Sequence, residues 1–248
     1  MNEQSWANRR REDVKLGIRR TLQKGGLGLV RDPFSQQVAR VLDAQGVTAL
    51  LDVGANVGQY GSMLRSAGFT GRIVSAEPLS GAHARLSERS AKDAAWTAVH
   101  TAVGAEPGEL VINVAANSYS SSVLDMEQAH RDVDARSAYV GTETVGVVTV
   151  ADLVASQRLD PARTALKVDT QGYESAVLDG AGDLLDVVPV VQLELSFVEL
   201  YSGQQLFDEL VARLVARGYT LWNLEPGIAG ADGRLLQCDG LFVRQGTA

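Results

Sequence analysis

The sequence alternates short apolar runs with longer stretches of helical periodicity, and this alternation constrains its fold more than any other feature. Apolar runs at residues 49–53 and 72–76 each lead into a stretch with helical spacing. Such alternation is typical of βαβ units and of a mainly parallel sheet with helices on both faces. We expect the remaining strands, all in the same sheet, at residues 98–103, 109–114, 145–150, 165–168, 187–195, 219–224 and 240–243.

The chain is long enough for one α/β domain with an N-terminal extension. Its 248 residues are 45% apolar, which supplies one sizeable core. Asp32 followed by Pro33 predicts the start of a helix, and Gly46 predicts its end. We therefore assign residues 1–46 to an N-terminal helical arm and residues 47–248 to the α/β domain. Residues 115–144 are polar and weakly periodic, and we expect them to form a partly helical insert over a substrate site.

Composition narrows the classes of partner. A net charge of −7 argues against general nucleic-acid binding, which needs an excess of Lys and Arg, so we expect a small-molecule ligand. The single cysteine, Cys238, excludes an intrachain disulfide and a multi-cysteine zinc site. The sequence has neither the apolar core of a signal peptide nor an apolar run of the ~20 residues needed to span a bilayer. We expect a cytoplasmic protein.

Residues 1–24 depart from this acidic average, with seven Lys or Arg against three Asp or Glu. Two interpretations stay open. The segment is a solvated arm, or it lies on an anionic membrane surface and makes a peripheral contact there.

A glycine-bearing turn follows the first expected strand and opens a helix. Its pattern is G-x-N-x-G, formed by Gly54, Asn56 and Gly58, and it lacks the G-x-G-x-x-G spacing that cradles a dinucleotide pyrophosphate. Glu77 follows the second strand, 23 residues after Gly54, where a carboxylate accepts hydrogen bonds from ribose hydroxyls. These features predict a nucleoside ligand without a diphosphate and disfavour a nicotinamide-dependent oxidoreductase.

The segment Asp52–Gly58 resembles the first motif of the FkbM methyltransferase family. The resemblance extends over about residues 50–243 and includes three later blocks in the same order, namely Ser120–Ser122, Tyr139–Val145 and Leu166–Glu174. Gln171 departs from the pattern, because the corresponding Lys-x-Asp-x-Glu-Gly block has an acidic residue at that position.

This resemblance implies an S-adenosylmethionine-dependent O-methyltransferase on a Rossmann-like class I fold, with seven mostly parallel strands and an antiparallel last strand. The acceptor it implies is a sugar hydroxyl of a glycoside, glycolipid or other natural product. A nucleoside-binding sensor without turnover is the alternative, and a homodimer is compatible with either. The resemblance implies donor contacts at Asp52, Gly54, Asn56, Gly58, Tyr60, Glu77, Val103, Ser122 and Asp169.

Methyl transfer to an alcohol requires a base or a metal to remove the proton. Asp169 ends one expected strand and Glu194 ends the next, so we predict that they line the acceptor pocket and hold a divalent cation such as magnesium. Lys167 and His130 are the further candidate catalytic residues. The alternatives are structural: Asp169 caps the following helix, and Glu194 pairs with Lys167.

Overall fold

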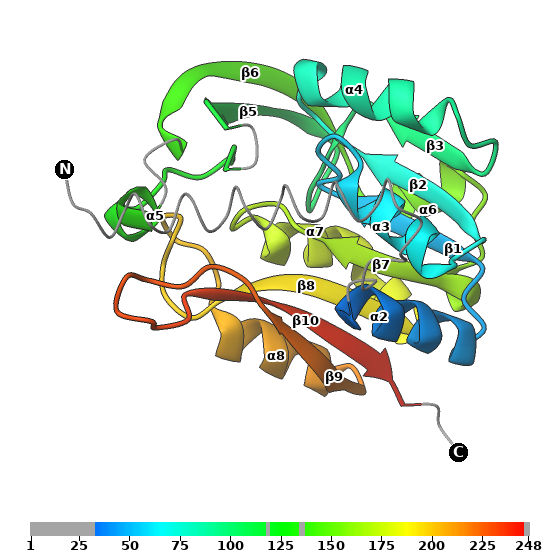
Figure 1. Ribbon diagram of the computed structural model, residues 1–248. Helices are drawn as coiled ribbons and strands as arrows, with labels where there is room; N and C mark the ends of the chain where they lie inside the picture. Colours follow the sequence, from blue (N-terminus) through cyan, green and yellow to red (C-terminus); the bar gives the residue numbers. More distant parts are fainter. Residues whose placement is uncertain (1–32, 118–119, 134–136, 246–248) are drawn as a thin grey trace, which may run out of the picture.

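The computed structural model describes residues 33–117, 120–133 and 137–245. Strands and helices alternate along the chain as predicted, and Figure 1 shows them in sequence colours. In chain order the helices and strands are α2 (Pro33–Ala44), β1 (Ala49–Val53), α3 (Gln59–Ala67), β2 (Arg72–Ala76), α4 (Ser80–Ser90), β3 (Trp96–Val99), β4 (Ala102–Val103), β5 (Gly108–Ala115), α5 (Gln128–Val133), β6 (Tyr139–Val148), α6 (Val150–Ser156), β7 (Thr164–Val168), α7 (Glu174–Ala181), β8 (Val190–Ser196), α8 (Phe207–Ala216), β9 (Tyr219–Pro226) and β10 (Gln237–Arg244).

The main sheet has seven strands in the order β3-β2-β1-β7-β8-β10-β9. Only β10 runs against its neighbours, so the predicted mostly parallel sheet with an antiparallel last strand is confirmed. The chain builds outward from β1 to β3, then returns to place β7 on the other side of β1. The carboxyl ends of β1 and β7 therefore flank a topological switch point, the usual ligand site of open α/β sheets.

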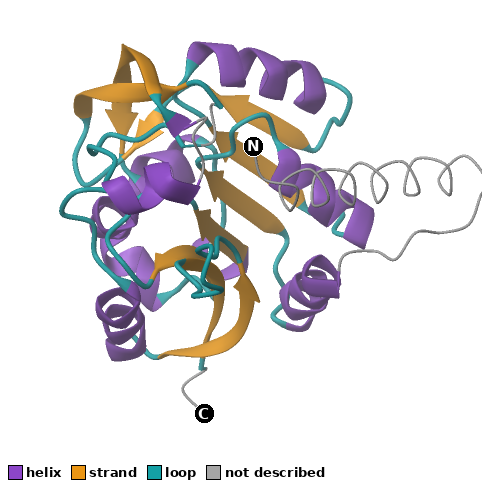
Figure 2. Ribbon diagram, turned by 60° about the vertical axis from the view of Figure 1, so that its left-hand side comes forward, coloured by secondary structure: helices purple, strands orange, loops and turns teal. Residues whose placement is uncertain are grey.

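Helices cover both faces of this sheet, as Figure 2 shows. Successive residues of β1 serve opposite faces, because side chains alternate along a strand. Leu50 packs with α2, α3 and α4 residues in one core cluster, and Leu51 packs with α6, α7 and α8 residues in the other. Every residue of β1 is buried, which explains why the strand is apolar apart from Asp52.

Two predicted strands do not extend the main sheet. The residues expected at 109–114 lie in β5, and those at 145–148 lie in β6. In a separate three-stranded sheet, β6 pairs with β5 on one side and with β4 on the other. The strand expected at 98–103 divides after Val99, so that β3 joins the main sheet and β4 joins the small one. The small sheet has a core of its own, with Leu79, Ile112 and Val147 among its members. Apolar periodicity identifies a strand but not the strand it pairs with. The prediction from sequence therefore placed β5 and β6 in the main sheet.

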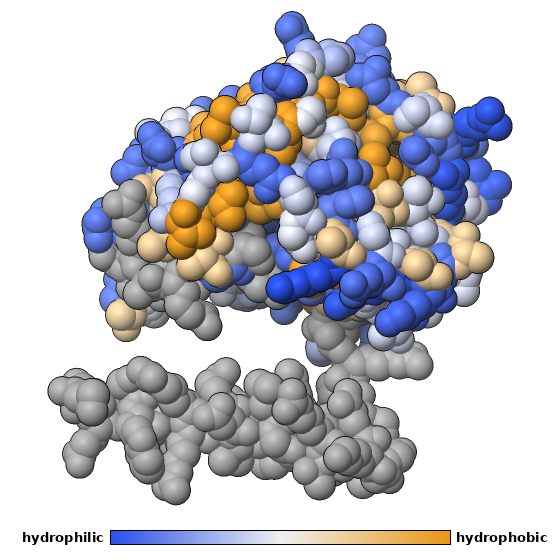
Figure 3. Space-filling model, turned by 90° about the horizontal axis from the view of Figure 1, so that it is seen from above, coloured by the Kyte–Doolittle hydropathy of each residue, from blue (hydrophilic) through white to orange (hydrophobic). Residues whose placement is uncertain are grey.

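The end of β6 also differs from the prediction. Thr149 and Val150 start α6 instead of continuing the strand, because Thr149 and Asp152 form a reciprocal capping box. The outer side of the small sheet carries exposed Val111 and Val140. Seen from above, apolar side chains gather in patches between polar ones on this side of the molecule (Figure 3).

Only part of the predicted arm and of the predicted insert lies within the described residues. Residues 1–32, including the basic segment, lie outside them. Helix α2 packs Phe34, Val38 and Leu42 against the main sheet, so this part of the predicted arm belongs to the domain core. The insert contains the short helix α5, but its last residues begin β6. Within the described part of the chain, no helix is long and apolar enough to cross a membrane.

Candidate active site

A cavity of about 1010 Å³ opens at the carboxyl ends of β1, β2, β7 and β8, beside the switch point. This is the size of a large ligand site. Its walls come from the loops that follow these strands, from the insert, and from the segment that joins β9 to β10. The site residues predicted from sequence that line it are Gly54, Asn56, Tyr60, Glu77, Val103, Ser122, His130, Lys167, Asp169 and Glu194.

The loop after β1 needs glycine at its first position. Gly54 has a φ of +74°, and a Cβ there would overlap the backbone carbonyl of Asp169. Only a residue without a side chain allows the loops after β1 and β7 to touch. The backbone N–H groups of Gly54 and Ala55 both donate to the carbonyl of Ala76 at 3.1 Å, which ties the loop to the end of β2.

Glu77 holds the loops after β1 and β2 together. Its Oε2 accepts from the backbone N–H of Asn56 at 2.8 Å, and its Oε1 accepts from that of Leu79 at 2.9 Å. The residue is only 5% exposed. Burial raises the pKa of the Glu77 carboxyl to about 7, although the two backbone hydrogen bonds oppose the shift. Glu77 is therefore a buried carboxylate at the cavity wall, with its charge stabilised by N–H donors.

Asp52 and Gly58 do not line the cavity, so their predicted direct contact with the donor is not supported by their placement. Asp52 is fully buried, accepts from Ser75 Oγ at 3.0 Å and pairs with Lys167 at 3.3 Å. Gly58 precedes α3 with a φ of +81°, and a Cβ there would press on Leu86 and Trp96. Both residues support the conformation of the loop without lining the cavity.

Lys167 is a buried counter-ion. Its Nζ lies 3.3 Å from Asp52 Oδ1, 3.3 Å from Asp169 Oδ2 and 3.4 Å from the carbonyl of Gly54. Burial alone would lower the pKa of Lys167, but the carboxylates of Asp169 and Asp52 raise it above its ordinary value. Because Nζ stays charged and engaged, Lys167 neutralises the site and is not a proton acceptor.

Four carboxylates stand in a row across adjacent strand ends, and we call them the acidic row. Asp239 of β10 lies opposite Glu194 of β8 and Glu225 of β9, and Asp169 follows Val168, the neighbour of Leu193. All four are half-buried and line the cavity. Burial raises the pKa of Asp239 to about 6, and the charge of Asp169 adds to the shift. Burial, followed by the charge of Asp169, also raises the pKa of Glu194.

The sequence missed two members of this row by one residue each. The expected strands ended at residue 224 and began at residue 240, whereas β9 includes Glu225 and β10 includes Asp239. An acidic residue at a strand end is a weak signal in a single sequence. The signal becomes clear only when the register of three strands aligns Glu194, Asp239 and Glu225.

The predicted metal pair does not fit the geometry. Gln171 Nε2 lies between the two carboxylates and donates to Asp169 Oδ1 at 2.9 Å and to Glu194 Oε2 at 2.7 Å. Among the described residues, no group of three or more His, Cys, Asp or Glu side chains is arranged to hold a metal ion. A cation between these two carboxylates would have to displace the Gln171 amide. We therefore propose no reaction step that uses a metal ion.

The two structural alternatives are also resolved. The helix after β7 begins at Glu174, and its N-cap residue is Tyr173, which makes no side-chain capping hydrogen bond, so Asp169 does not serve as the cap. Glu174 Oε1 accepts from the backbone N–H groups of Thr170 and Gly172 in the preceding loop. Glu194 takes its hydrogen bond from Gln171, and Lys167 pairs with Asp52 and Asp169 instead. Asp169 and Glu194 thus line the cavity wall, where both accept hydrogen bonds from Gln171.

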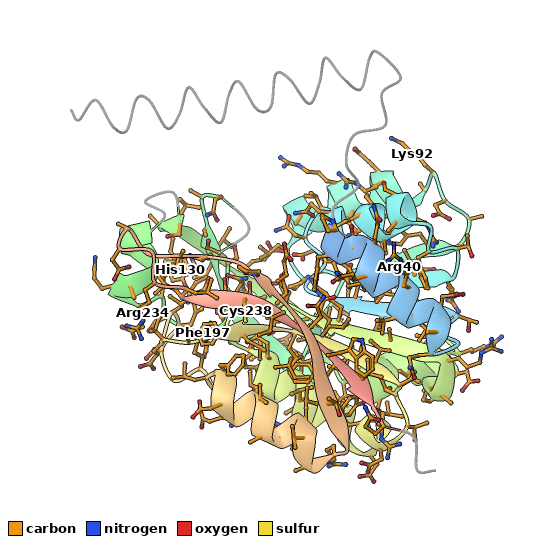
Figure 4. All side chains as sticks on the ribbon, turned by 60° about the horizontal axis from the view of Figure 1, so that its bottom comes forward. Arg40, Lys92, His130, Phe197, Arg234 and Cys238 are labelled. Atoms are coloured by element: carbon orange, nitrogen blue, oxygen red, sulfur yellow. The ribbon has the colours of Figure 1, made fainter. Side chains whose placement is uncertain are left out.

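His130 lies on the insert side of the cavity, on α5. It is buried, its Nε2 is 3.1 Å from Ser120 Oγ, and its ring meets the ring of Tyr201 edge-on at 5.1 Å. Figure 4 shows His130 at the same end of the molecule as Cys238 and Arg234, away from Arg40 on α2. Ser122 also anchors the insert, because its Oγ donates to the carbonyl of Gln171 at 2.7 Å.

The family comparison agrees with this arrangement. The model of the FkbM methyltransferase domain matches residues 52–221, which span β1 to β9. No curated protein matches the chain.

Solved structures with similar folds are methyltransferases. Magnesium protoporphyrin IX methyltransferase from Synechocystis PCC 6803, solved with bound SAM, is 12% identical, with 92% of this chain and 91% of that chain covered and a TM-score of 0.47. Precorrin-6y C5,15-methyltransferase from Geobacter metallireducens GS-15 is 10% identical, with 88% and 92% covered and a TM-score of 0.46. These likenesses are too distant to indicate a substrate. The family match covers more than half of the sequence, and the chain belongs to the FkbM methyltransferase family.

Proposed function

We propose that this protein transfers the methyl group of S-adenosylmethionine to a hydroxyl of a sugar-containing acceptor, such as a glycoside, glycolipid or other glycosylated natural product. The observation that carries the proposal is one cavity with two chemically different ends. One end has the Gly54 loop, Glu77 and Val103, and the other has the acidic row and the insert.

The first end suits a nucleoside. Glu77 offers carboxylate oxygens to the two ribose hydroxyls, and the Gly54–Asn56 loop lines the cavity beside the amino-acid portion of the donor. Val103 lies at the wall where the adenine would pack. When bound, the donor supplies an electrophilic methyl group, and the chain's own task is to orient an acceptor oxygen in line with it.

The second end suits an uncharged, hydroxyl-rich acceptor. Carboxylates accept hydrogen bonds from hydroxyl groups, and the acidic row places four of them along one edge of the cavity. Asp169 also accepts from Lys167 and Gln171, and Glu194 also accepts from Gln171. Lys167 is the only lysine or arginine among the described residues that line the cavity, and its charge is engaged by Asp52 and Asp169. A phosphate or carboxylate on the acceptor would meet net repulsion here.

Asp169 or its neighbour Glu194 is the proposed base that takes the hydroxyl proton. General bases work best when their pKa lies near the operating pH. Burial raises the pKa of Glu194 above its ordinary value, and so towards neutral pH. His130 approaches from the insert and is proposed to contact the acceptor. Lys167 holds Asp169 in place rather than moving a proton.

The test is calorimetry with S-adenosylmethionine and its demethylated product, followed by mass spectrometry of a panel of glycosides. We expect donor binding and a mass gain of one methyl group on an acceptor. Absence of donor binding by a folded sample would contradict the whole proposal. Binding without turnover across the panel would favour the sensor alternative, and exclusive activity on a nonsugar alcohol would overturn only the sugar assignment.

The membrane contact of residues 1–24 and the homodimer stay predictions. If the basic segment docks a lipid-linked acceptor, its deletion should weaken binding to anionic vesicles in a salt-dependent way and raise the acceptor KM at unchanged donor affinity. Unchanged acceptor kinetics would favour the interpretation of residues 1–24 as a solvated arm.

A further inference from the structure

Gln171 joins three parts of the site that are distant in sequence. Its Nε2 bridges Asp169 and Glu194, its Oε1 accepts from Tyr201 Oη at 2.7 Å, and its backbone carbonyl accepts from Ser122 Oγ at 2.7 Å. Every polar atom of the Gln171 side chain is therefore engaged. The amide uses one N–H for each carboxylate, so no donor is left for a further partner.

The orientation of this amide is fixed by its neighbours. A flipped amide would point Oε1 at two carboxylate oxygens and leave Tyr201 facing the NH₂ group, which is electrostatically unfavourable. Tyr201 is fully buried, and its hydroxyl lies 3.3 Å from the carbonyl of Ser120 in the insert. Tyr201 also packs on Gly172, where a Cβ would come within 2.9 Å of the Tyr201 Cβ and 3.2 Å of its ring.

The backbone of Gln171 is held in a conformation that glycine prefers. Its φ of +55° lies in the left-handed region, which costs a non-glycine residue about 1 kcal/mol or more. Such a conformation persists when its surroundings determine it, and here hydrogen bonds from Ser122 and Tyr201 do so. The strain places the side chain between two carboxylates that would otherwise repel each other.

We propose that the Gln171 amide is a built-in neutral bridge, which occupies the position that a divalent cation would need between Asp169 and Glu194 and so makes the acceptor end of the cavity independent of metal. Gln171 is thus a positioning residue for the pair. The part that the Gln171 bridge plays in catalysis rests on the proposed function. Its effect on cation binding does not depend on that function.

The isosteric change Gln171→Glu tests this idea, because it replaces the bridging donor with a third carboxylate at the same place. The probe is Mn²⁺ alone, titrated into the full-length protein and followed by calorimetry and electron paramagnetic resonance. We expect Gln171→Glu to bind one Mn²⁺ at least about tenfold more tightly than the wild-type protein, since affinity for hard cations rises with the number of carboxylate ligands. Adding Asp169→Asn to this variant should remove the gain.

Two further variants complete the experiment. Gln59→Glu adds the same charge to the same cavity from α3 and should leave Mn²⁺ binding at the wild-type level. Gln171→Ala removes the bridge without adding charge and should bind Mn²⁺ with an affinity between those of the wild type and Gln171→Glu. This variant keeps the test valid if Gln171→Glu does not fold, and circular dichroism reports folding in each case.

Three results would overturn the proposal: Mn²⁺ binding by the wild-type protein that Asp169→Asn abolishes, no gain in Gln171→Glu or Gln171→Ala, or an equal gain in Gln59→Glu. Loss of donor-product binding by the folded wild-type protein would instead count against the proposed function. The two ideas can therefore fail separately.

Discussion

The backbone carbonyl of Asp169 occupies the space that a Cβ on Gly54 would fill, so the loops after β1 and β7 meet without a side chain between them. This contact brings the donor loop against the residue at the start of the acidic row. The two ends of the cavity are joined at this point.

Replacing Gly54 should therefore damage both folding and donor binding. Gly54→Ala forces a Cβ into the Asp169 carbonyl at a positive φ, and we expect a stability loss of about 2–4 kcal/mol together with loss of measurable donor binding. Gly46→Ala is the matched control, because Gly46 also has a positive φ (+65°) but open space around it. It should cost only about 1 kcal/mol and leave donor affinity intact. Urea denaturation and calorimetry measure both quantities, and equal effects of the two substitutions would refute the contact argument.

Glu77 should control donor affinity. Glu77→Ala removes charge-assisted hydrogen bonds to the ribose and should weaken donor binding by about 2–4 kcal/mol. Glu225→Ala, which changes a carboxylate at the other end of the same cavity, serves as the control and should change donor binding little. Calorimetry with the demethylated product measures both variants. Unchanged affinity in Glu77→Ala would show that the ribose lies elsewhere.

The raised pKa of Glu77 also predicts a pH dependence. With a pKa of about 7, the carboxyl becomes protonated as the pH falls through neutrality, and its ability to accept from two hydroxyls is lost. Donor affinity should therefore rise from pH 6 to a plateau above pH 8. The linked effect on folding has the opposite sign: because the pKa is raised in the folded state, the contribution of Glu77 to stability is present at acidic pH and is lost as the pH rises through 7. In Glu77→Gln the step in donor affinity should disappear, and its persistence would assign the titration to another group.

Lys167 should act as a structural counter-ion. Lys167→Met leaves Asp52 buried without its partner, and breaking such a pair typically costs about 3–5 kcal/mol. The double variant Asp52→Asn/Lys167→Met should recover much of that loss, because no unpaired charge remains. Chemical denaturation of the two single variants and the double variant gives the coupling energy. Additive losses would mean that the pair does not interact in the way the 3.3 Å contact indicates.

The acidic row should make the protein discriminate against anionic acceptors. A glycoside with a free hydroxyl should be methylated better than the same compound with a phosphate next to that hydroxyl, by about tenfold or more in kcat/KM. Glu225→Gln should reduce the ratio of kcat/KM between the two acceptors, because it removes one repelling charge at the far end of the acidic row. Competition assays with the two acceptors measure the ratio, and a preference for the phosphorylated compound would contradict this account of the site.

The sequence by itself determined the βαβ architecture and the position of the glycine loop after β1. Both depend on local patterns: alternating apolar periodicity, glycines at a strand-to-helix turn, and a carboxylate after the second strand. Leu50 and Leu51 illustrate why this works, because most residues of a strand buried on both faces are apolar, and these two pack into different core clusters. The residues from Gly54 to Glu77 lie near one another in sequence, so their spacing carries most of the geometry.

Only the tertiary structure decided which strands share a sheet and which carboxylates share a wall. Apolar periodicity could not separate β5 and β6 from the main sheet, because hydrogen-bond partners are chosen over long distances in the chain. For the same reason the sequence did not reveal Asp239 and Glu225, because only the antiparallel return of β10 places Asp239 between Glu194 and Glu225. It also concealed the role of Gln171, since an amide acquires a bridging function only when folding brings two carboxylates within reach of its two N–H groups.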